Sequence, residues 1–432
     1  VELLLEKGVD PNVCKMNGRI PLIRASSKGH TDVAKLLLEK GVDPNICDKA
    51  GKTSLIGASS KGYTDVAKLL LHKGADPNIS SNNYRATPLI VASSGGHGDI
   101  AKLLLDKGAD PNIYDEDGDT PLIIASREGR TNIAKLLLEK GADPNIYDMD
   151  GDTPLVWGSN NGHTNVTKLL LEQGADPNID DEDGDTPLIV SSREGHIDIV
   201  KLLLEKGVDP NISNEDGDTP LIRASINGHA SIVALLLEKG ADPNICNRTG
   251  DTPLIVASSK GHTDVAKLLL EKGVDPDICN KDRDTPLIRA SREGHSKIAK
   301  LLLEKGAAPN IKNKDWDTPL IRASRKGHSD IAKLLLEKGV DPNISDIYGD
   351  TPLIVTSMEG RTDVAKLLLE NGADPSISNE GGDTALMWAS SKGHADIAKL
   401  LLEKGTDPNI SNTNGYTPLM GPSNNGHTDT VE

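Results

Sequence analysis

Histidine is the residue type in this chain best suited to acid–base catalysis or metal binding, and the sequence contains eleven. A catalytic or metal site needs side chains that converge on one point, whereas side chains at a regular interval are spread along a structure. Ten of the eleven follow a glycine and recur at close to multiples of one fixed interval: His30, His97, His163, His196, His229, His262, His295, His328, His394 and His427. We therefore predict a structural role for these ten. His72 stands apart, at a position that other copies fill with Glu or Asp.

The four cysteines are too few for a disulfide framework in a chain of 432 residues. The interval from Cys14 to Cys47 equals that from Cys246 to Cys279, so each pair takes equivalent positions in adjacent layers. Neighbouring helix layers lie about 8–10 Å apart, which exceeds the roughly 7 Å between Cα atoms that a disulfide spans. We expect free, partly exposed thiols and no zinc site. The expected compartment is intracellular, the cytoplasm first and the nucleus as the alternative.

Two other motifs resemble ligand-binding loops but lack necessary residues. The acidic segment 115–119, repeated at 181–185, suggests a calcium loop, which needs Gly at its sixth position and Glu at its twelfth. Here Gly118 is fourth and Ser126 is twelfth, so we interpret the segment as a solvated hairpin tip. Gly51-Lys52-Thr53 resembles the end of a phosphate-binding loop, but the earlier glycine is replaced by Ile46. We expect no enzyme activity, no cofactor and no metal.

Composition excludes other classes of protein. Hydrophobic residues make up 36% of the chain, aromatic residues 2%, and Phe is absent, so several wide cores are not expected. The formal charge of −17 would repel a nucleic-acid backbone, so we expect no nucleic-acid partner. No apolar run approaches the roughly 18 residues of a membrane span, so we expect a soluble chain without membrane insertion.

A sequence repeat runs through the chain with a regular period. Thirteen tripeptides similar to Thr-Pro-Leu mark this repeat. They follow one another at a constant interval, except that an extra residue within the polar stretch 80–86 makes one interval longer by one residue. The tripeptides begin at Ile20, Thr53, Thr87, Thr120, Thr153, Thr186, Thr219, Thr252, Thr285, Thr318, Thr351, Thr384 and Thr417. A regular period of about 33 residues indicates stacked structural units.

Each repeat predicts two short helices, as residues 119–146 illustrate. Thr120 is a helix N-cap followed by Pro at the first helical position, and Gly129 ends the first helix. A second helix follows, capped by Thr131 or Asn132, and Asp-Pro-Asn at 143–145 turns the chain outward. Helices this short are marginal alone, so neighbouring copies must stack.

The chain resembles an ankyrin-repeat protein along its whole length. The resemblance rests on Thr-Pro-Leu at the helix starts, on Gly-His pairs such as 195–196 and 261–262, and on Leu-Leu-Leu-Glu-Lys-Gly-Ala-Asp-Pro-Asn at 136–145. It implies an all-α fold, a solenoid of stacked helix-turn-helix units with projecting hairpin loops. It also implies hydrogen bonds from the ten histidines between neighbouring repeats. One departure is an apolar fourth residue, such as Ile123, where the family usually has His.

We expect one repeat array over residues 1–432. Residues 1–14 would be a partial second helix and turn, about twelve full repeats would occupy 15–411, and 412–432 would be a partial last repeat that frays at Pro422. Because both ends fall inside expected second helices, we also expect a fragment of a longer array that lacks capping repeats. The expected oligomeric state is monomeric.

The hairpin tips and the exposed side of the first helices are the candidate partner surface. The tips are rich in acidic residues such as Glu116 and Asp117, and an Asp usually precedes the helix-capping Thr. Together these residues form an acidic edge. The edge either keeps the turns solvated or binds a basic segment of a partner. Examples of the Asp residues that precede Thr are Asp119, Asp152, Asp185, Asp218, Asp284 and Asp317.

Arg and Trp, the residue types enriched in binding hot spots, gather on the first helices and tips between 285 and 388. Trp316 replaces the usual tip glycine, either as a contact or as a tolerated substitution. The candidate protein-binding residues are Arg289, Arg292, Trp316, Arg322, Arg325, Tyr348, Trp388, Trp157 and Arg223.

These observations favour a non-catalytic scaffold that binds a protein segment on its concave face. The acidic tips favour a partner with basic segments, and the arginines would attract carboxylates or carbonyl groups. Two alternatives stay open: an elastic or spacing element, and the targeting arm of a larger multidomain protein.

Overall fold

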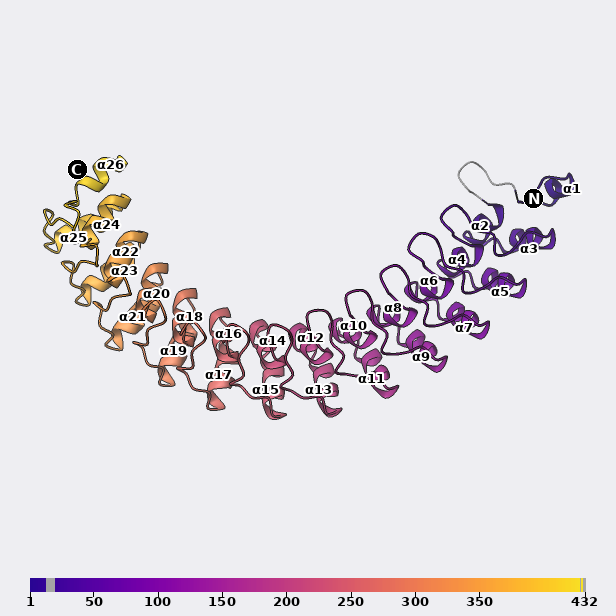
Figure 1. The fold of residues 1–432 in the computed structure, drawn as a ribbon, viewed down its shortest axis with the longest axis horizontal. Helices are drawn as coiled ribbons and strands as arrows, with labels where there is room; N and C mark the ends of the chain where they lie inside the picture. The colour runs from indigo at the N-terminus through magenta and orange to yellow at the C-terminus, as the bar shows by residue number, and fades with distance from the viewer. Residues whose placement is uncertain (13–19, 428, 430–432) are drawn as a thin grey trace. The chain divides into compact units, whose positions relative to one another are not determined.

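The computed structural model describes residues 1–12, 20–427 and 429. Within these residues it contains 26 helices and no β-strand, with two isolated bridges, Cys47 to Thr53 and Ser378 to Thr384. The helices come in pairs, and an extended hairpin loop leads from each pair to the next (Figure 1). This confirms the predicted all-α solenoid of helix-turn-helix units.

The chain divides into two compact units, each with six helix pairs. The first unit comprises Val1–Asp209 and Ser213–Glu215. It contains α1 (Glu2–Glu6), α2 (Pro21–Ser26), α3 (Thr31–Glu39), α4 (Ser54–Ser59), α5 (Thr64–His72), α6 (Pro88–Ser94), α7 (Gly98–Asp106), α8 (Pro121–Arg127), α9 (Thr131–Glu139), α10 (Pro154–Asn160), α11 (Thr164–Glu172), α12 (Pro187–Glu194) and α13 (Ile197–Glu205).

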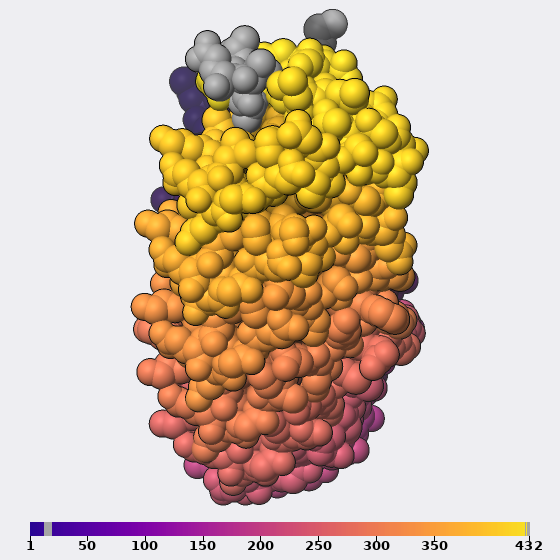
Figure 2. Space-filling model, turned by 90° about the vertical axis from the view of Figure 1, so that its left-hand side faces the viewer, coloured from indigo at the N-terminus to yellow at the C-terminus, as the bar shows by residue number. Residues whose placement is uncertain are grey.

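The second unit comprises Pro210–Ile212 and Asp216–Glu432. It contains α14 (Pro220–Asn227), α15 (Ala230–Glu238), α16 (Pro253–Lys260), α17 (Thr263–Glu271), α18 (Pro286–Glu293), α19 (Ser296–Glu304), α20 (Pro319–Lys326), α21 (Ser329–Glu337), α22 (Pro352–Glu359), α23 (Thr362–Glu370), α24 (Ala385–Lys392), α25 (Ala395–Glu403) and α26 (Met420–Asn425). Figure 2 shows its C-terminal repeats as successive layers in contact.

The first helix of every repeat before the last begins directly after the Thr position, and in most of these repeats with the predicted Pro. In α8 the backbone N–H of Ile123 donates to the Thr120 hydroxyl at 3.2 Å, and Pro121 opens the helix. The cap satisfies a backbone N–H that the helix cannot pair internally. A Thr side chain caps the first helix in this way at Thr53, Thr87, Thr120, Thr153, Thr219, Thr285, Thr318, Thr351 and Thr384.

The second helix begins without a side-chain cap. Thr131 is the first residue of α9 and Arg130 is the N-cap, so the predicted cap by Thr131 or Asn132 is wrong. The turn between α8 and α9 is tight, and the N–H of Thr131 bonds back to the Gly129 carbonyl at 3.0 Å. The turn therefore brings the helix start forward by one residue and satisfies that N–H with backbone alone.

The core of each repeat lies between its two helices and those of its neighbours. Leu122, Ile123 and Ala125 of α8 pack with Ala134 and Leu137 of α9, and each is at most 1% exposed. The two alanines allow the helices to approach closely because they carry only a methyl group. Buried Ile123 also shows that apolar packing occupies the fourth position of the repeat.

Histidines join neighbouring repeats, as the resemblance implied. The Nε2 atom of His163 lies 3.0 Å from the carbonyl oxygen of Arg127, 36 residues earlier. Five further histidines make the same contact at 2.9–3.3 Å: His196, His262, His295, His328 and His394. The ring also covers a glycine of the preceding repeat: a Cβ on Gly129, where φ is +68°, would lie 2.7 Å from His163. The structural role is thus confirmed for these six residues.

The Asp-Pro-Asn turns supply a second link between repeats. The side-chain oxygen of Asn112 accepts from the N–H of Asp143 at 2.9 Å, and its amide donates to the Gly141 carbonyl at 3.3 Å. Asn78 and Asn343 make the same pair of bonds. The turn residue of one repeat thus holds the turn of the next.

The last helix departs from the pattern. α26 begins at Met420 with Leu419 as its N-cap, whereas earlier first helices begin directly after the residue equivalent to Thr417. Pro422 therefore falls in the first turn of a shortened helix, where its missing N–H has little consequence.

Three of the four cysteines lie in the described residues. Cys47, Cys246 and Cys279 are free and exposed, which confirms the prediction for these three. Cys14 lies outside the described residues.

Candidate protein-binding surface

Arg322 connects the first helix α20 to the hairpin tip that precedes it. Its Nε lies 2.9 Å from Oδ2 of Asp317, the residue before the capping Thr318. Its Nη2 donates to Oδ2 of Asp315 on the tip at 3.2 Å. The Arg322 guanidinium therefore pairs with two carboxylates: that of Asp317, which is buried, and that of Asp315, which is exposed on the tip.

Arg325, one turn further along α20, bridges two repeats. Its Nη2 lies 3.4 Å from Oδ1 of Asp317 and 3.2 Å from Oδ2 of Asp346 in the following repeat. Burial raises the pKa of Asp317 above its ordinary value, and the neighbouring Arg322 and Arg325 partly offset this effect. Both carboxylates are almost fully buried, and this arginine supplies the positive charge that they need.

The preceding repeat has a similar pair of arginines on α18. The Nε of Arg289 lies 2.9 Å from Oδ2 of Asp284, and its Nη2 lies 3.5 Å from Oδ1 of Asp251, one repeat earlier. Arg292 donates to Asp284 at 3.5 Å. The charges of these arginines are therefore already matched by carboxylates of the same chain.

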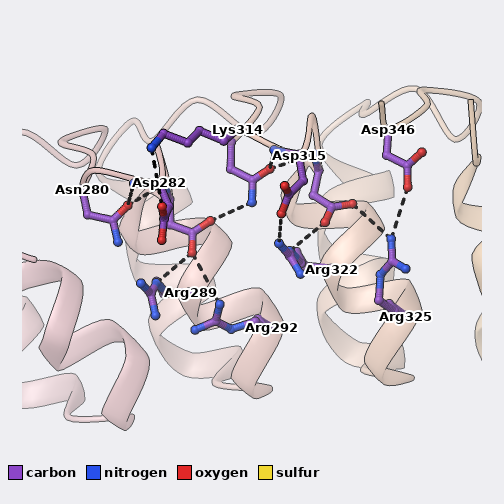
Figure 3. A network of polar contacts seen from close by, with 12 residues as sticks. Asn280, Asp282, Arg289, Arg292, Lys314, Asp315, Arg322, Arg325 and Asp346 are labelled. Carbon is purple, nitrogen blue, oxygen red and sulfur yellow. Dashed lines mark hydrogen bonds and ion pairs between the residues drawn. The ribbon is translucent and has the colours of Figure 1, made fainter. Parts of the chain in front are cut away.

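Asparagines extend the network from repeat to repeat. The amide of Asn313 donates to Asp284 at 2.9 Å, while its oxygen accepts the N–H groups of Asp315 and Asp317 at 3.0 and 2.9 Å. Asn280 donates to Asp251 at 2.7 Å in the same way. Figure 3 shows the resulting run of contacts from Asn280 to Asp346 across the tips and first helices.

The acidic edge contains fewer exposed carboxylates than the sequence predicts. Six of the nine Asp residues that precede the Thr at a first-helix start are buried and face the helices instead of solvent, because they pair with Arg and Asn side chains: Asp119, Asp185, Asp218, Asp284, Asp317 and Asp350. The exposed acidic residues are those at the tips themselves, such as Glu116, Asp117, Glu182 and Asp183.

Trp157 and Arg223 are also fixed by acidic residues. The indole N–H of Trp157 on α10 donates to Oδ2 of Asp148 at 2.8 Å, and the Arg127 guanidinium lies 4.7 Å from its ring centre. Arg223 on α14 has its Nε 3.1 Å from Oδ2 of Asp218. Both side chains are half-buried, so each presents only part of its surface to a partner.

Aromatic side chains are exposed on two consecutive hairpin tips. Trp316 is 54% exposed and Tyr348 is 66% exposed, with Ile347 beside it at 45%. The N–H of Ile347 donates to the carbonyl of Asp315 at 3.2 Å, which joins the two tips. We call Trp316, Ile347 and Tyr348 the tip patch. Single exposed apolar residues are common, but a group of three large ones is not.

Trp388 on α24 lines a small pocket near α26 and is half-buried. The ammonium of Lys392 lies 5.8 Å from its ring centre. The pocket has a volume of 170 Å³.

The structure brings four of the candidate residues, Arg289, Arg292, Arg322 and Arg325, into one polar network. Trp316 and Tyr348 lie on consecutive tips in the tip patch, while Trp388 and Arg223 occupy other repeats of the second unit and Trp157 belongs to the first unit. Sequence reasoning missed the asparagines of the network. A usable signal was present, since Asn or Asp recurs four residues before the Asp that precedes Thr.

Comparison with protein families agrees with this architecture. A family described as ankyrin repeats (3 copies) matches residues 1–81, 79–148, 141–214, 221–313, 287–379 and 353–432, and one described as ankyrin repeats (many copies) matches 192–237. The chain belongs to the ankyrin-repeat family. Ankyrin repeats are generally protein–protein interaction modules and typically non-catalytic. No curated protein is significantly similar to the chain.

Two further properties bear on the partners of this ankyrin-repeat chain. Within residues 1–12, 20–427 and 429, no helix is both long and apolar enough to cross a membrane. The same part of the chain contains no group of three or more His, Cys, Asp or Glu side chains placed to hold a metal ion.

Proposed function

We propose that the chain is a non-catalytic scaffold that binds a protein segment on the side formed by its first helices and hairpin tips. The observation that carries the proposal is Trp316, a large ring exposed at a backbone position that nearly every other repeat fills with glycine. Trp side chains dominate the energetics of many interfaces. The centre of the proposed surface is therefore the tip patch in the second unit.

The backbone at Trp316 supports this assignment. Its φ is +61°, and a left-handed conformation costs a residue with a side chain about 1–2 kcal/mol. The neighbouring tip is also close: a Cβ added to the equivalent Gly250 would lie 2.6 Å from the backbone N of Lys281. Strain of this kind is often retained at functional sites. Arg283, at the equivalent tip position one repeat earlier, has the same φ of +61°.

The arginine network supports the surface in a different way. Arg289, Arg292, Arg322 and Arg325 are paired with carboxylates of the chain, so they hold the tips against the first helices. A rigid surface loses less conformational entropy on binding than a mobile one. We include these arginines in the proposed surface, together with Trp388, Trp157 and Arg223, for the edges that they expose.

The charge of the chain favours a partner with basic segments. The formal charge is −17, and exposed acidic residues occupy the tips of both units, including Glu182 and Asp183 in the first and Asp282 and Asp315 in the second. Complementary charge accelerates association and discriminates against acidic partners. We propose a protein partner and a monomeric scaffold.

The experiment is affinity capture with the full chain, compared with a Trp316→Gly, Tyr348→Ala variant. Glycine at 316 keeps the backbone conformation and removes only the ring. Tyr147→Ala is the matched control, because Tyr147 is 64% exposed on a tip of the first unit. We expect a protein that the wild type and the control recover and the variant does not. Equal recovery by all three would refute the tip patch as the binding surface.

The spacing alternative makes a separate prediction. A spacer would lose its function when whole repeats are deleted, and it would tolerate the Trp316→Gly, Tyr348→Ala variant. A scaffold would lose its function in the Trp316→Gly, Tyr348→Ala variant, and it would tolerate the deletion of repeats that lie away from the tip patch.

A further inference from the structure

The pocket beside Trp388 is a candidate binding site within the second unit. It has a volume of 170 Å³, and its lining includes Asp383, Met387, Trp388, Asn412, Tyr416 and Gly421. These residues come from α24, from the loop that precedes it, and from the loop and first turn of the following repeat. The space is comparable to that of one large side chain.

An equivalent place four repeats earlier is occupied by an arginine of the chain itself. Gly421 corresponds to Arg289, and Asp383 corresponds to Asp251, since the members of each pair take the same position relative to the Thr of their repeats. Arg289 places its Nη2 3.5 Å from Asp251 and its side chain is only 17% exposed. The repeat with Gly421 lacks this side chain, which leaves the space between the layers open.

The chain cannot supply the missing arginine from α26. A Cβ on Gly421 would lie 2.7 Å from Cβ and 2.9 Å from Cα of Ser391 on α24. Contacts this short with backbone require a shift of the helices. Glycine at this position therefore allows α26 to lie close to α24 while the pocket stays empty of side chains.

Asp383 has fewer partners than three equivalent carboxylates of earlier repeats, Asp251, Asp284 and Asp317. It accepts from the Asn412 amide at 2.7 Å, just as Asp251 accepts from Asn280. Asp251, Asp284 and Asp317 each also pair with at least one arginine. No ion pair to Asp383 occurs among the residues that the structure describes, so a half-buried carboxylate in the pocket lacks a cation.

The indole N–H of Trp388 is also without a partner. It is buried and has no acceptor within the described part of the chain, whereas the equivalent Trp157 donates to Asp148 at 2.8 Å. Asn379 replaces that aspartate, and its side chain is already bonded to Asp350 and to the N–H of Asp383. The Trp388 ring therefore lacks the hydrogen bond that fixes the Trp157 ring.

We propose that this pocket binds an arginine side chain of a partner protein. The guanidinium pairs with the Asp383 carboxylate and stacks on the Trp388 ring. Arginine fits better than lysine because its planar group both stacks on an aromatic ring and bonds a carboxylate. This proposal rests on the proposed scaffold function and names the chemistry of its partner.

The test uses the full chain and two short probes, acetyl-Gly-Arg-Gly-amide and the same peptide with citrulline, which has the same shape without the charge. Binding is followed by the ¹H–¹⁵N signal of the Trp388 indole, assigned by its loss in Trp388→Phe. We expect a saturable shift with the arginine peptide and at least about tenfold weaker binding of the citrulline peptide, since the ion pair is lost. An equal shift with both probes, or none with either, would overturn the proposal.

Two variants and one control test the individual contacts. Asp383→Asn keeps the acceptor for Asn412 but removes the charge, so arginine binding should weaken about tenfold. Lys392→Gln removes an exposed competing cation near the ring and should strengthen binding. Asp251→Asn is the matched control, because Arg289 already occupies its site; binding should be unchanged. Unaltered binding in Asp383→Asn would refute the assignment.

The outcomes separate this site from the proposed function. If the arginine peptide does not bind but a partner is still lost with Trp316→Gly, Tyr348→Ala, the pocket assignment fails and the scaffold proposal stands. If the peptide binds and the tip variant has no effect on partner capture, the pocket assignment holds and the tip patch fails.

Discussion

The side-chain amide of Asn280 donates a 2.7 Å hydrogen bond to the carboxylate of Asp251 in the preceding repeat. The equivalent residues in the first unit are Asp181 and Asp152. A second carboxylate therefore stands where the amide would donate. The same position of the repeat thus produces an attractive contact in one unit and a repulsive one in the other.

This repulsion contributes to an unusual titration. Burial, together with repulsion from Asp148, Asp181 and Asp150, raises the pKa of Asp152 to about 7, while Arg127 acts against this rise. An aspartate whose folded pKa lies above its unfolded value stabilises the fold fully below about pH 4, and this contribution is lost as the pH rises through 7. The titration of Asp152 alone therefore makes the first unit less stable at pH 8 than at pH 5.5.

The first prediction concerns Asp181→Asn. The new amide can donate to Asp152, as Asn280 does to Asp251, so the charged form of Asp152 is stabilised. We expect a gain of about 1–2 kcal/mol at pH 8 and a smaller gain at pH 5.5. Urea unfolding at the two pH values, followed by circular dichroism, measures the difference.

The reverse substitution is the matched control for that prediction. Asn280→Asp places a carboxylate opposite Asp251 and should destabilise the second unit more at pH 8 than at pH 5.5. If both variants shift stability equally at the two pH values, the raised pKa of Asp152 does not control the pH dependence.

The second prediction concerns the pairing of Arg322 with Asp317. In Arg322→Met the buried carboxylate keeps Arg325 at 3.4 Å but loses its 2.9 Å partner. We expect a loss of about 1–3 kcal/mol, because a buried charge is left with incomplete compensation. In the Arg322→Met, Asp317→Asn double variant much of this loss should be recovered, and a double-mutant cycle gives the coupling energy.

An exposed ion pair in the same network provides the comparison. Lys314 lies 3.7 Å from Asp282, and both side chains are more than half exposed. Lys314→Ala should change stability by less than about 0.5 kcal/mol. Equal effects from Lys314→Ala and Arg322→Met would contradict the role assigned to burial.

The third prediction uses a substitution that the chain itself contains. His328 contacts the Arg292 carbonyl at 3.1 Å, and Arg361, which replaces His one repeat later, donates to the Arg325 carbonyl at 3.3 Å. His328→Arg should therefore cost less than about 0.5 kcal/mol, while His328→Ala should cost about 1 kcal/mol through the lost hydrogen bond and contact. Thermal unfolding of both variants checks the order; a larger loss for the arginine variant would be contrary evidence.

The sequence was sufficient to predict the helix pairs and the joining of repeats by histidine. Thr120 and Pro121 fix the start of α8 through local chemistry, and the regular period places every copy. The start of α9 was missed because the tight backbone turn at Gly129, and not a side chain, determines it. Local propensity alone does not show how closely a turn folds back.

The candidate surface was less predictable than the fold. Residue type and register placed Arg322 on the first helix, but its pairing with Asp317 depends on how the hairpin returns to the helix start. The same cause explains why Asp317 was expected in an exposed acidic edge and is buried. Trp316, whose exposure follows from its place at a tip, needed no such long-range information.

The last prediction separates stability from binding at Trp316. Its φ of +61° is one that glycine adopts without steric cost, and most other repeats have glycine there. We therefore expect Trp316→Gly to stabilise the second unit by about 1 kcal/mol, even though it removes the ring proposed to bind the partner. The Lys312 ammonium lies 5.0 Å from the ring and also donates to the Ser345 carbonyl at 3.0 Å, so it keeps a partner when the ring is removed, and the lost contact offsets only part of this gain.

Urea unfolding of Trp316→Gly is compared with Arg283→Gly, which relieves the same φ one repeat earlier and should stabilise by a similar amount. The opposite substitution, Gly349→Ala, introduces a Cβ 3.0 Å from the backbone N of Glu380 at a φ of +78° and should destabilise. If Trp316→Gly lowers stability, the ring contributes more to packing than it costs in backbone strain, and the argument that the strain is retained for binding fails. A gain in stability together with loss of partner capture is the combination expected of a residue kept for recognition.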